Sequence, residues 1–112
     1  MVRKFAVVAL ILGALTFVVS GNSWAAKSHA AEAVEHAQEA VDHGKQGHAD
    51  ALVHHAEGAL KHAEAAQKEK ANPHLEGGIK YLKEAIEHGK AGHADVATKS
   101  AEEAVKHLSE VK

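Results

Sequence analysis

Apolar residues recur at three- and four-residue spacing along most of this chain, which is the pattern of amphipathic helices. Four such stripes run through residues 30–41, 52–66, 75–86 and 94–111. No segment shows the strict alternation of apolar and polar residues that indicates a β-strand. Four helices with short connections predict an all-α protein, an up-down-up-down four-helix bundle.

The residues between the stripes carry signals for helix ends. Gly44 follows the first stripe, and a glycine there predicts a left-handed C-cap. Asp50 falls in the first turn of the next helix, where a carboxylate suits the helix dipole. Between the second and third stripes, Asn72 is predicted as the N-cap and Pro73 as the first helical residue.

The second half of the sequence is a copy of the first, displaced by 45 residues. The segment His-Gly-Lys-Gln-Gly-His-Ala-Asp at 43–50 recurs at 88–95 with a single substitution, and shorter matches extend on both sides. An internal repeat of this length is one supersecondary unit. We therefore expect two duplicated helical hairpins, at about residues 28–67 and 73–112.

The beginning of the chain has the composition of an export signal. A positive pair at residues 3–4 precedes an apolar stretch at 5–19 and a run of small residues, the arrangement of a secretory signal peptide. The apolar stretch is shorter than the roughly 20 residues of a spanning helix, although an uncleaved anchor is an alternative. The prediction is a signal peptide over residues 1–25.

Cleavage after Ala25 leaves residues 26–112 as one exported domain, which we expect in the periplasm and free of the membrane. Cleavage after Ala26 is the less favoured alternative, because it sets the bulky Trp24 three residues before the cut. That alternative gives a mature chain beginning Lys-Ser-His, a sequence whose free amine and third-position histidine chelate Cu(II) and Ni(II).

Composition narrows the classes of partner. Loss of two basic residues with the signal leaves 11 basic and 15 acidic side chains. This mildly acidic balance argues against nucleic acid, which requires a basic face, and is compatible with a cationic ligand. The absence of cysteine excludes disulfides and a lipoprotein anchor. Because the apolar residues are mostly alanine, the core buries little area and the bundle is predicted to be slim and modestly stable.

Histidine supplies the most informative pattern. Ten of the eleven histidines occupy one heptad position beside the apolar stripes, and only His54 does not. The ten are His29, His36, His43, His48, His55, His62, His74, His88, His93 and His107. Imidazole is the commonest metal-ligating side chain in proteins. A column of imidazoles beside an apolar seam therefore predicts metal binding.

An antiparallel hairpin brings together residues whose numbers have a constant sum, and the histidines obey this rule. The predicted facing pairs are His43 with His48, His36 with His55, His29 with His62, His88 with His93, and His74 with His107. The rule gives one further facing pair in the second hairpin, and its members are Tyr81 and Ser100 instead of histidines. These two residues are expected to pack or face solvent. Histidines seven residues apart on one helix lie about 10.5 Å apart, so each pair is predicted to form a separate site.

Carboxylates lie four residues before several of these histidines, on the same helix face. They are Glu32, Glu39, Glu84 and Glu103, and Asp50 and Asp95 stand near the turns. Each is a candidate ligand or hydrogen-bond partner of an imidazole, and each has the alternative role of a solvated surface charge. Nitrogen and oxygen ligands without thiolate suit Cu(II), Ni(II) and Zn(II), with Cu(II) bound most strongly. Because binding requires neutral imidazole, affinity is expected to fall below about pH 6.5.

Other functions for such a bundle are less compatible with the sequence. Di-iron enzymes pair glutamate with histidine three residues later on inward-facing positions, which differs from the spacing here. The haem attachment motif Cys-x-x-Cys-His is absent. We therefore expect no enzyme. Bis-histidine haem stays open, although an alanine core leaves little room for a porphyrin. The main alternative is a pH-responsive or chaperone-like bundle with incidental metal binding, since opposed imidazoles repel each other when protonated.

The heptad-spaced histidines, the duplicated His-Gly-Lys-x-Gly-His turn and the Ala-Thr-Lys segment at 97–99 resemble the small metal-binding proteins, the SmbP-like family. The resemblance covers essentially the whole predicted mature chain. It implies a periplasmic, monomeric four-helix bundle that binds several divalent ions, copper foremost, through the ten histidines in metal homeostasis. Tyr81 and Ser100 depart from the pattern, so a site at their position is in doubt.

Overall fold

Four α-helices make up nearly all of the described part of the chain, residues 27–112 of this computed structural model. They are α2 (His29–Lys45), α3 (Ala49–Glu69), α4 (Pro73–Lys90) and α5 (Ala94–Ser109), and these residues contain no strand. None of these helices combines the length and apolar character needed to cross a membrane. The predicted signal peptide, residues 1–25, lies outside the described residues.

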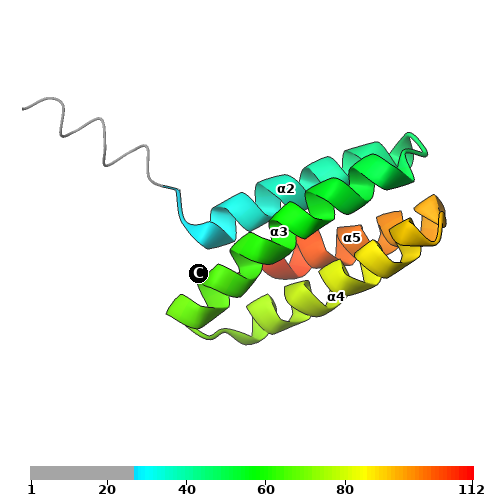
Figure 1. Ribbon diagram of the computed structural model, residues 1–112. Helices are drawn as coiled ribbons and strands as arrows, with labels where there is room; N and C mark the ends of the chain where they lie inside the picture. Colours follow the sequence, from blue (N-terminus) through cyan, green and yellow to red (C-terminus); the bar gives the residue numbers. More distant parts are fainter. Residues whose placement is uncertain (1–26) are drawn as a thin grey trace, which may run out of the picture.

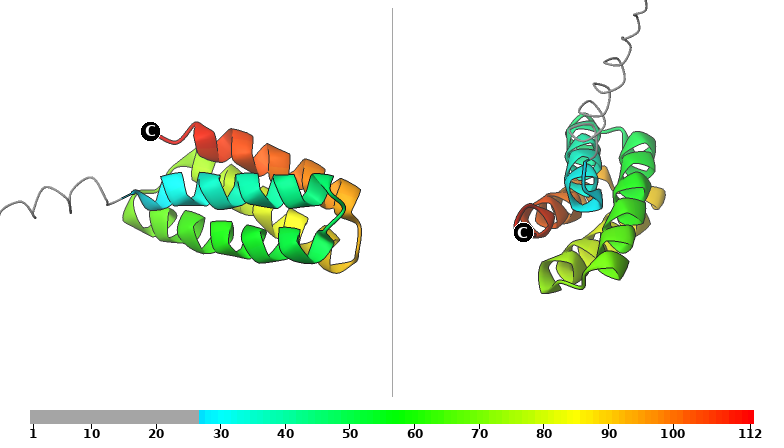
Figure 2. Two further views of the ribbon diagram at one scale, coloured as in Figure 1. Left: turned by 90° about the horizontal axis from the view of Figure 1, so that it is seen from above. Right: turned by 90° about the vertical axis from the view of Figure 1, so that its left-hand side faces the viewer.

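The helices run antiparallel and form a closed ring of neighbours. Helix α2 packs against α3 and α5, and α4 packs against the same two helices, as the two views in Figure 2 show. Both hairpin turns lie at one end of the bundle, while the α3–α4 linker and the end of α5 lie at the other (Figure 1). The predicted up-down-up-down bundle of two helical hairpins is confirmed.

Side-chain caps begin two of the helices. The backbone N–H of Ala31 donates to Ser28 Oγ at 3.1 Å at the start of α2. At the start of α4, the N–H of His74 donates to Asn72 Oδ1 at 2.7 Å, and Pro73 is the first helical residue. The predicted roles of Asn72 and Pro73 are confirmed.

The predicted left-handed cap at Gly44 is wrong. Helix α2 continues through Lys45, and the left-handed residue is Gly47 with φ of 81°. Gly44 is buried inside the helix, where a Cβ atom would come within 2.0 Å of Thr98 Oγ1 on α5. Its function is therefore to let two helices approach closely, a tertiary requirement that a local signal does not carry.

Alanine dominates the core. Eleven of the seventeen buried apolar residues in the described chain are alanines, and the largest fully buried side chains are Leu52, Leu75, Leu82 and Leu108. Small side chains allow neighbouring helices to approach closely, so the residues that flank the core meet across narrow grooves. The histidines occupy these flanking positions and are mostly half-buried.

Candidate metal centre

Histidines from α2 and α3 face each other along the whole groove of the first hairpin. The ring centroids are 5.3 to 6.3 Å apart in the three predicted pairs, His29 with His62, His36 with His55, and His43 with His48. The constant-sum rule thus identified the correct neighbours. Whether these side chains ligate metal remains a prediction.

The rings of the two helices also interleave. His36 stacks on His62 with centroids 5.4 Å apart, and His43 stacks on His55 at 4.8 Å, each pair inclined by 7°. Separate pairs were expected, yet diagonal neighbours are as close as opposite ones. Side chains on a helix lean toward its N-terminus, and antiparallel helices lean in opposite directions. Each of the four inner rings therefore lies between two rings from the opposite side of the groove, in one continuous column that ends at His29 and His48.

A three-residue cluster stands out at the middle of this column. His55 Nδ1 lies 3.0 Å and His36 Nδ1 lies 3.6 Å from the same atom, Glu39 Oε1. One ligand atom from each of the three residues lies within 4.8 Å of the others. We call this cluster the middle triad; within residues 27–112 it is the one group of at least three potential metal ligands.

The middle triad has the chemistry and the spacing that a divalent ion needs. An ion with ligands at about 2.1 Å holds those atoms at most about 4.2 Å apart, so small side-chain movements suffice. His36 Nδ1 is buried without a hydrogen-bond partner, which is unfavourable for a polar atom unless something else satisfies it. The side chains of His36, Glu39 and His55 are 37%, 55% and 24% exposed, so the cluster is accessible from solvent.

A second set of contacts lies near the start of α2. His29 Nδ1 and His62 Nδ1 are 3.0 Å apart, and the other nitrogen of His62 lies 3.1 Å from Glu32 Oε1. His29 Nε2 lies 3.9 Å from Glu69 Oε2. Because the two nitrogens of His62 point to different partners, these side chains form a chain of contacts rather than a convergent cluster.

The carboxylates contact different histidines from those expected. Glu32 and Glu39 were predicted to accompany His36 and His43, four residues later on α2. Instead Glu32 contacts His62 and Glu39 contacts His55, both across the groove. The same lean toward the helix N-terminus turns each carboxylate away from the following histidine and toward the opposite helix.

The remaining candidate carboxylates make no contact with a histidine in the described residues. Glu103 pairs with Lys106 at 3.3 Å on α5. Glu84 is half-buried, Asp50 and Asp95 are exposed, and none of the three forms an ion pair within residues 27–112. Their role as ligands has no support from these contacts.

One ion pair outside the groove changes the titration of its members. A hydrogen bond between the Lys27 ammonium and the Glu35 carboxylate, reinforced by their opposite charges, raises the pKa of Lys27 and lowers the pKa of Glu35. Both side chains are about half exposed, so this pair contributes little to stability.

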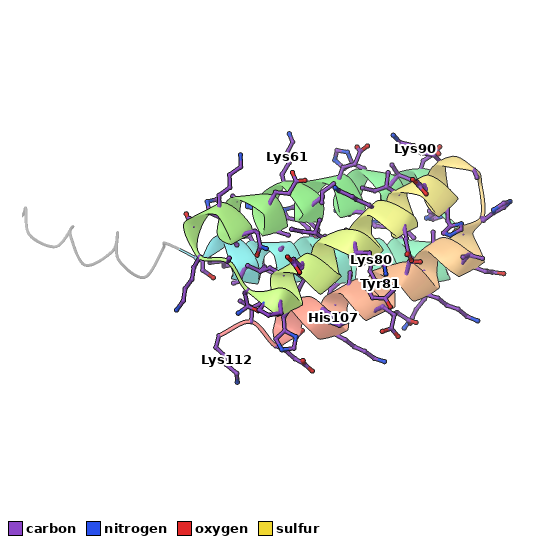
Figure 3. The ribbon with its side chains drawn as sticks, turned by 90° about the horizontal axis from the view of Figure 1, so that it is seen from below. Lys61, Lys80, Tyr81, Lys90, His107 and Lys112 are labelled. Atoms are coloured by element: carbon purple, nitrogen blue, oxygen red, sulfur yellow. The ribbon has the colours of Figure 1, made fainter. Side chains whose placement is uncertain are left out.

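The second hairpin carries a reduced version of the column. His74 and His107 face each other with centroids 6.2 Å apart, and His74 Nδ1 lies 3.2 Å from Glu110 Oε1. Tyr81 stacks on His107 at 5.5 Å, just as His36, its counterpart in the first copy, stacks on His62. Figure 3 shows Tyr81 and His107 along the groove between α4 and α5. Of the two roles expected for Tyr81, packing or facing solvent, the structure shows packing.

The structure does not bring His88 and His93 together. His88 is half-buried and His93 is exposed, and no ring contact between them occurs within residues 27–112. Their counterparts in the first copy make contact, and there His43 also stacks on His55. Ser100 replaces that third histidine in the second copy, so His88 has no ring on which to stack.

Several residues near the column escaped the sequence analysis. They are Glu110 beside His74, Gly58 beneath His36, and His54, whose ring meets His55 edge-on at 5.5 Å. The residue numbers of Glu39 and His55 add to the same total as those of Glu32 and His62. The constant-sum rule, applied to carboxylates as well as histidines, therefore indicates both of these contacts. No comparable signal exists for Gly58.

Comparison with known proteins adds one finding. The family model described as small metal-binding protein matches residues 4–111, nearly the whole chain. A search of curated proteins found no match.

Proposed function

This chain belongs to the small metal-binding protein family, and from that premise we propose that it scavenges or buffers divalent transition metals after export to the periplasm. The observation that carries the proposal is the convergence of His36 Nδ1 and His55 Nδ1 on Glu39 Oε1. Two imidazoles and one carboxylate form an established ligand set for such ions. Cu(II) is the preferred ion and Ni(II) and Zn(II) bind more weakly, following the Irving–Williams order.

The middle triad fills first, because its ligand atoms are already close together and one of them lacks any other partner. Further ions bind with lower affinity at the other histidine pairs, where two imidazoles do not converge with a carboxylate as in the middle triad. The full ligand set is the ten heptad histidines with Glu39. Since the groove is partly exposed, its ions exchange readily, which suits a buffer rather than a catalyst.

A Cu(II) titration at pH 7.5 tests the proposal. The wild-type protein is expected to bind more than one ion per chain. The double variant His36→Tyr with His55→Ser, which introduces the residues of the second copy, is expected to lose the tightest site. His93→Ser is the matched control, because His93 is exposed and is expected to contribute little to that site.

Two results would count against this function. Retention of the tightest site in the double variant overturns the assignment to the middle triad. Binding of no more than one weakly held ion by the wild type rejects the buffer, and favours the pH-responsive or chaperone-like bundle. Export is tested separately by cell fractionation and N-terminal sequencing, where Ala26 as first residue indicates cleavage after Ala25, and Lys27 indicates the metal-chelating terminus.

A further inference from the structure

A surface depression adjoins the middle triad on α3. It has a volume of about 230 Å³ and is lined by His36, His54, His55, Glu57, Gly58 and Lys61. Gly58 lets the His36 ring pack against α3, because a Cβ atom at this position would lie 3.3 Å from His36 Nδ1. The depression therefore borders two of the residues that the proposed function assigns to the metal.

Comparison of the two copies explains how the depression arises. The counterpart of Lys61 is Lys106, whose ammonium pairs with Glu103 at 3.3 Å. The counterpart of Glu103 is Gly58. Glycine in place of glutamate at position 58 thus removes a side chain from the surface. It also removes the carboxylate that would neutralise Lys61.

Lys61 consequently has no ionic partner among residues 27–112, where the lysine ion pairs involve Lys27, Lys45, Lys90 and Lys106. Its side chain extends from α3 into solvent (Figure 3). The one acidic side chain that lines the depression, Glu57, pairs with Lys90 at 3.7 Å. The groups left to interact with a ligand are therefore an ammonium and imidazole rings.

An ion in the middle triad changes this surface further. A divalent ion with one carboxylate ligand keeps a net positive charge, and three protein ligands leave coordination positions open. The depression is lined by His36 and His55, two of the three residues of the middle triad. An anion in the depression would lie beside Lys61 and beside two of the residues that would hold the ion.

We propose that this depression binds a small oxyanion, a carboxylate or bicarbonate, as a co-ligand of the metal held by the middle triad. The inference rests on the proposed function, since the anion completes the coordination of that metal. A volume of about 230 Å³ exceeds that of several water molecules, at about 30 Å³ each, and accommodates a small organic acid.

The test loads the protein with one equivalent of Cu(II) in a non-coordinating buffer and adds acetate or, separately, bicarbonate. We expect a saturable change in the Cu(II) electron paramagnetic resonance spectrum, with copper still bound to the protein after gel filtration. Lys61→Gln is expected to weaken the anion affinity about fivefold, since it removes a charged hydrogen-bond donor. Lys106→Gln, the matched position in the second copy, is expected to match the wild type.

The proposal is overturned if neither anion changes the spectrum, if Lys61→Gln and Lys106→Gln behave alike, or if the anion strips copper from the protein. The two anions distinguish an organic acid from bicarbonate as the better co-ligand. Failure of the proposed function gives a different result, because the protein then holds no Cu(II) before any anion is added.

Discussion

At the scale of single residues, Glu39 shows how side-chain direction determines a candidate site. Its position three residues after His36 and four before His43 allows either contact in sequence. The lean of helical side chains toward the N-terminus favours the first, and the carboxylate reaches both His36 and His55. A carboxylate shared by two imidazoles from different helices holds their nitrogens in place for an ion.

Glu39→Gln is therefore expected to weaken the tightest Cu(II) site about tenfold, in the range seen for groups that ligate or orient a metal ligand. The matched control is Glu84→Gln, the same position in the second copy, where no histidine contact occurs in the described chain. Competition with a chromophoric chelator measures both affinities. Equal affinity in the two variants contradicts the role assigned to Glu39.

At the scale of helices and turns, local signals predicted most boundaries. Asn72 and Pro73 begin α4 as expected, because an N-cap depends on neighbours in sequence. Gly44 was misassigned because its role depends on Thr98 of α5, which is distant in sequence. The copied turn of the second hairpin has its left-handed residue at the equivalent position, Gly92.

Because Gly47 is the left-handed residue and Gly44 lies at a helix contact, asparagine should destabilise the bundle more at Gly44 than at Gly47. Asparagine tolerates the left-handed region, and nothing lies within 4 Å of a Cβ at Gly47, so Gly47→Asn should cost little. Gly44→Asn forces a side chain into the α2–α5 contact and should destabilise the bundle by about 1–3 kcal/mol or more. Urea denaturation measures both. A larger loss for Gly47→Asn indicates that Gly44, not Gly47, is the left-handed cap.

The duplicated hairpins also permit a gain of function. Tyr81 and Ser100 are the counterparts of His36 and His55, and Glu84 is the counterpart of Glu39. The double variant Tyr81→His with Ser100→His should therefore create a second triad and add one tight Cu(II) site. Tyr81→His alone is the control and should add none. If the double variant binds copper no better than this control, the three side chains are insufficient for a tight site.

At the scale of the whole molecule, the sequence was sufficient for the fold because periodicity and duplication are properties of the entire chain. Four of the five predicted histidine pairs followed from the same regularity, and His88 with His93 did not. The middle triad did not, since it depends on rotamers and on how closely alanine lets α2 approach α3. The depression depends on Gly58, whose importance emerges only when His36 is placed above it.

A core of small side chains buries little apolar area, so we expect the metal-free bundle to be modestly stable and metal binding to stabilise it further. Metal that binds the folded bundle better than the unfolded chain raises stability by about 2.7 kcal/mol at a free concentration of 100 times Kd. For a domain of this size, that corresponds to a rise in Tm of about 10–20 °C. Differential scanning calorimetry with Cu(II), and with excess chelator as the reversal control, measures it.

The size of this rise also tests how well the bundle arranges its ligands. The unfolded chain retains every imidazole and binds copper too, which reduces the effect. A large rise therefore requires ligands that converge only after folding, as those of the middle triad do. The variant His36→Tyr with His55→Ser should show a smaller rise than the wild type. If Cu(II) leaves Tm unchanged or lowers it, folding contributes nothing to metal affinity, and the histidine column acts as no more than a local concentration of imidazoles.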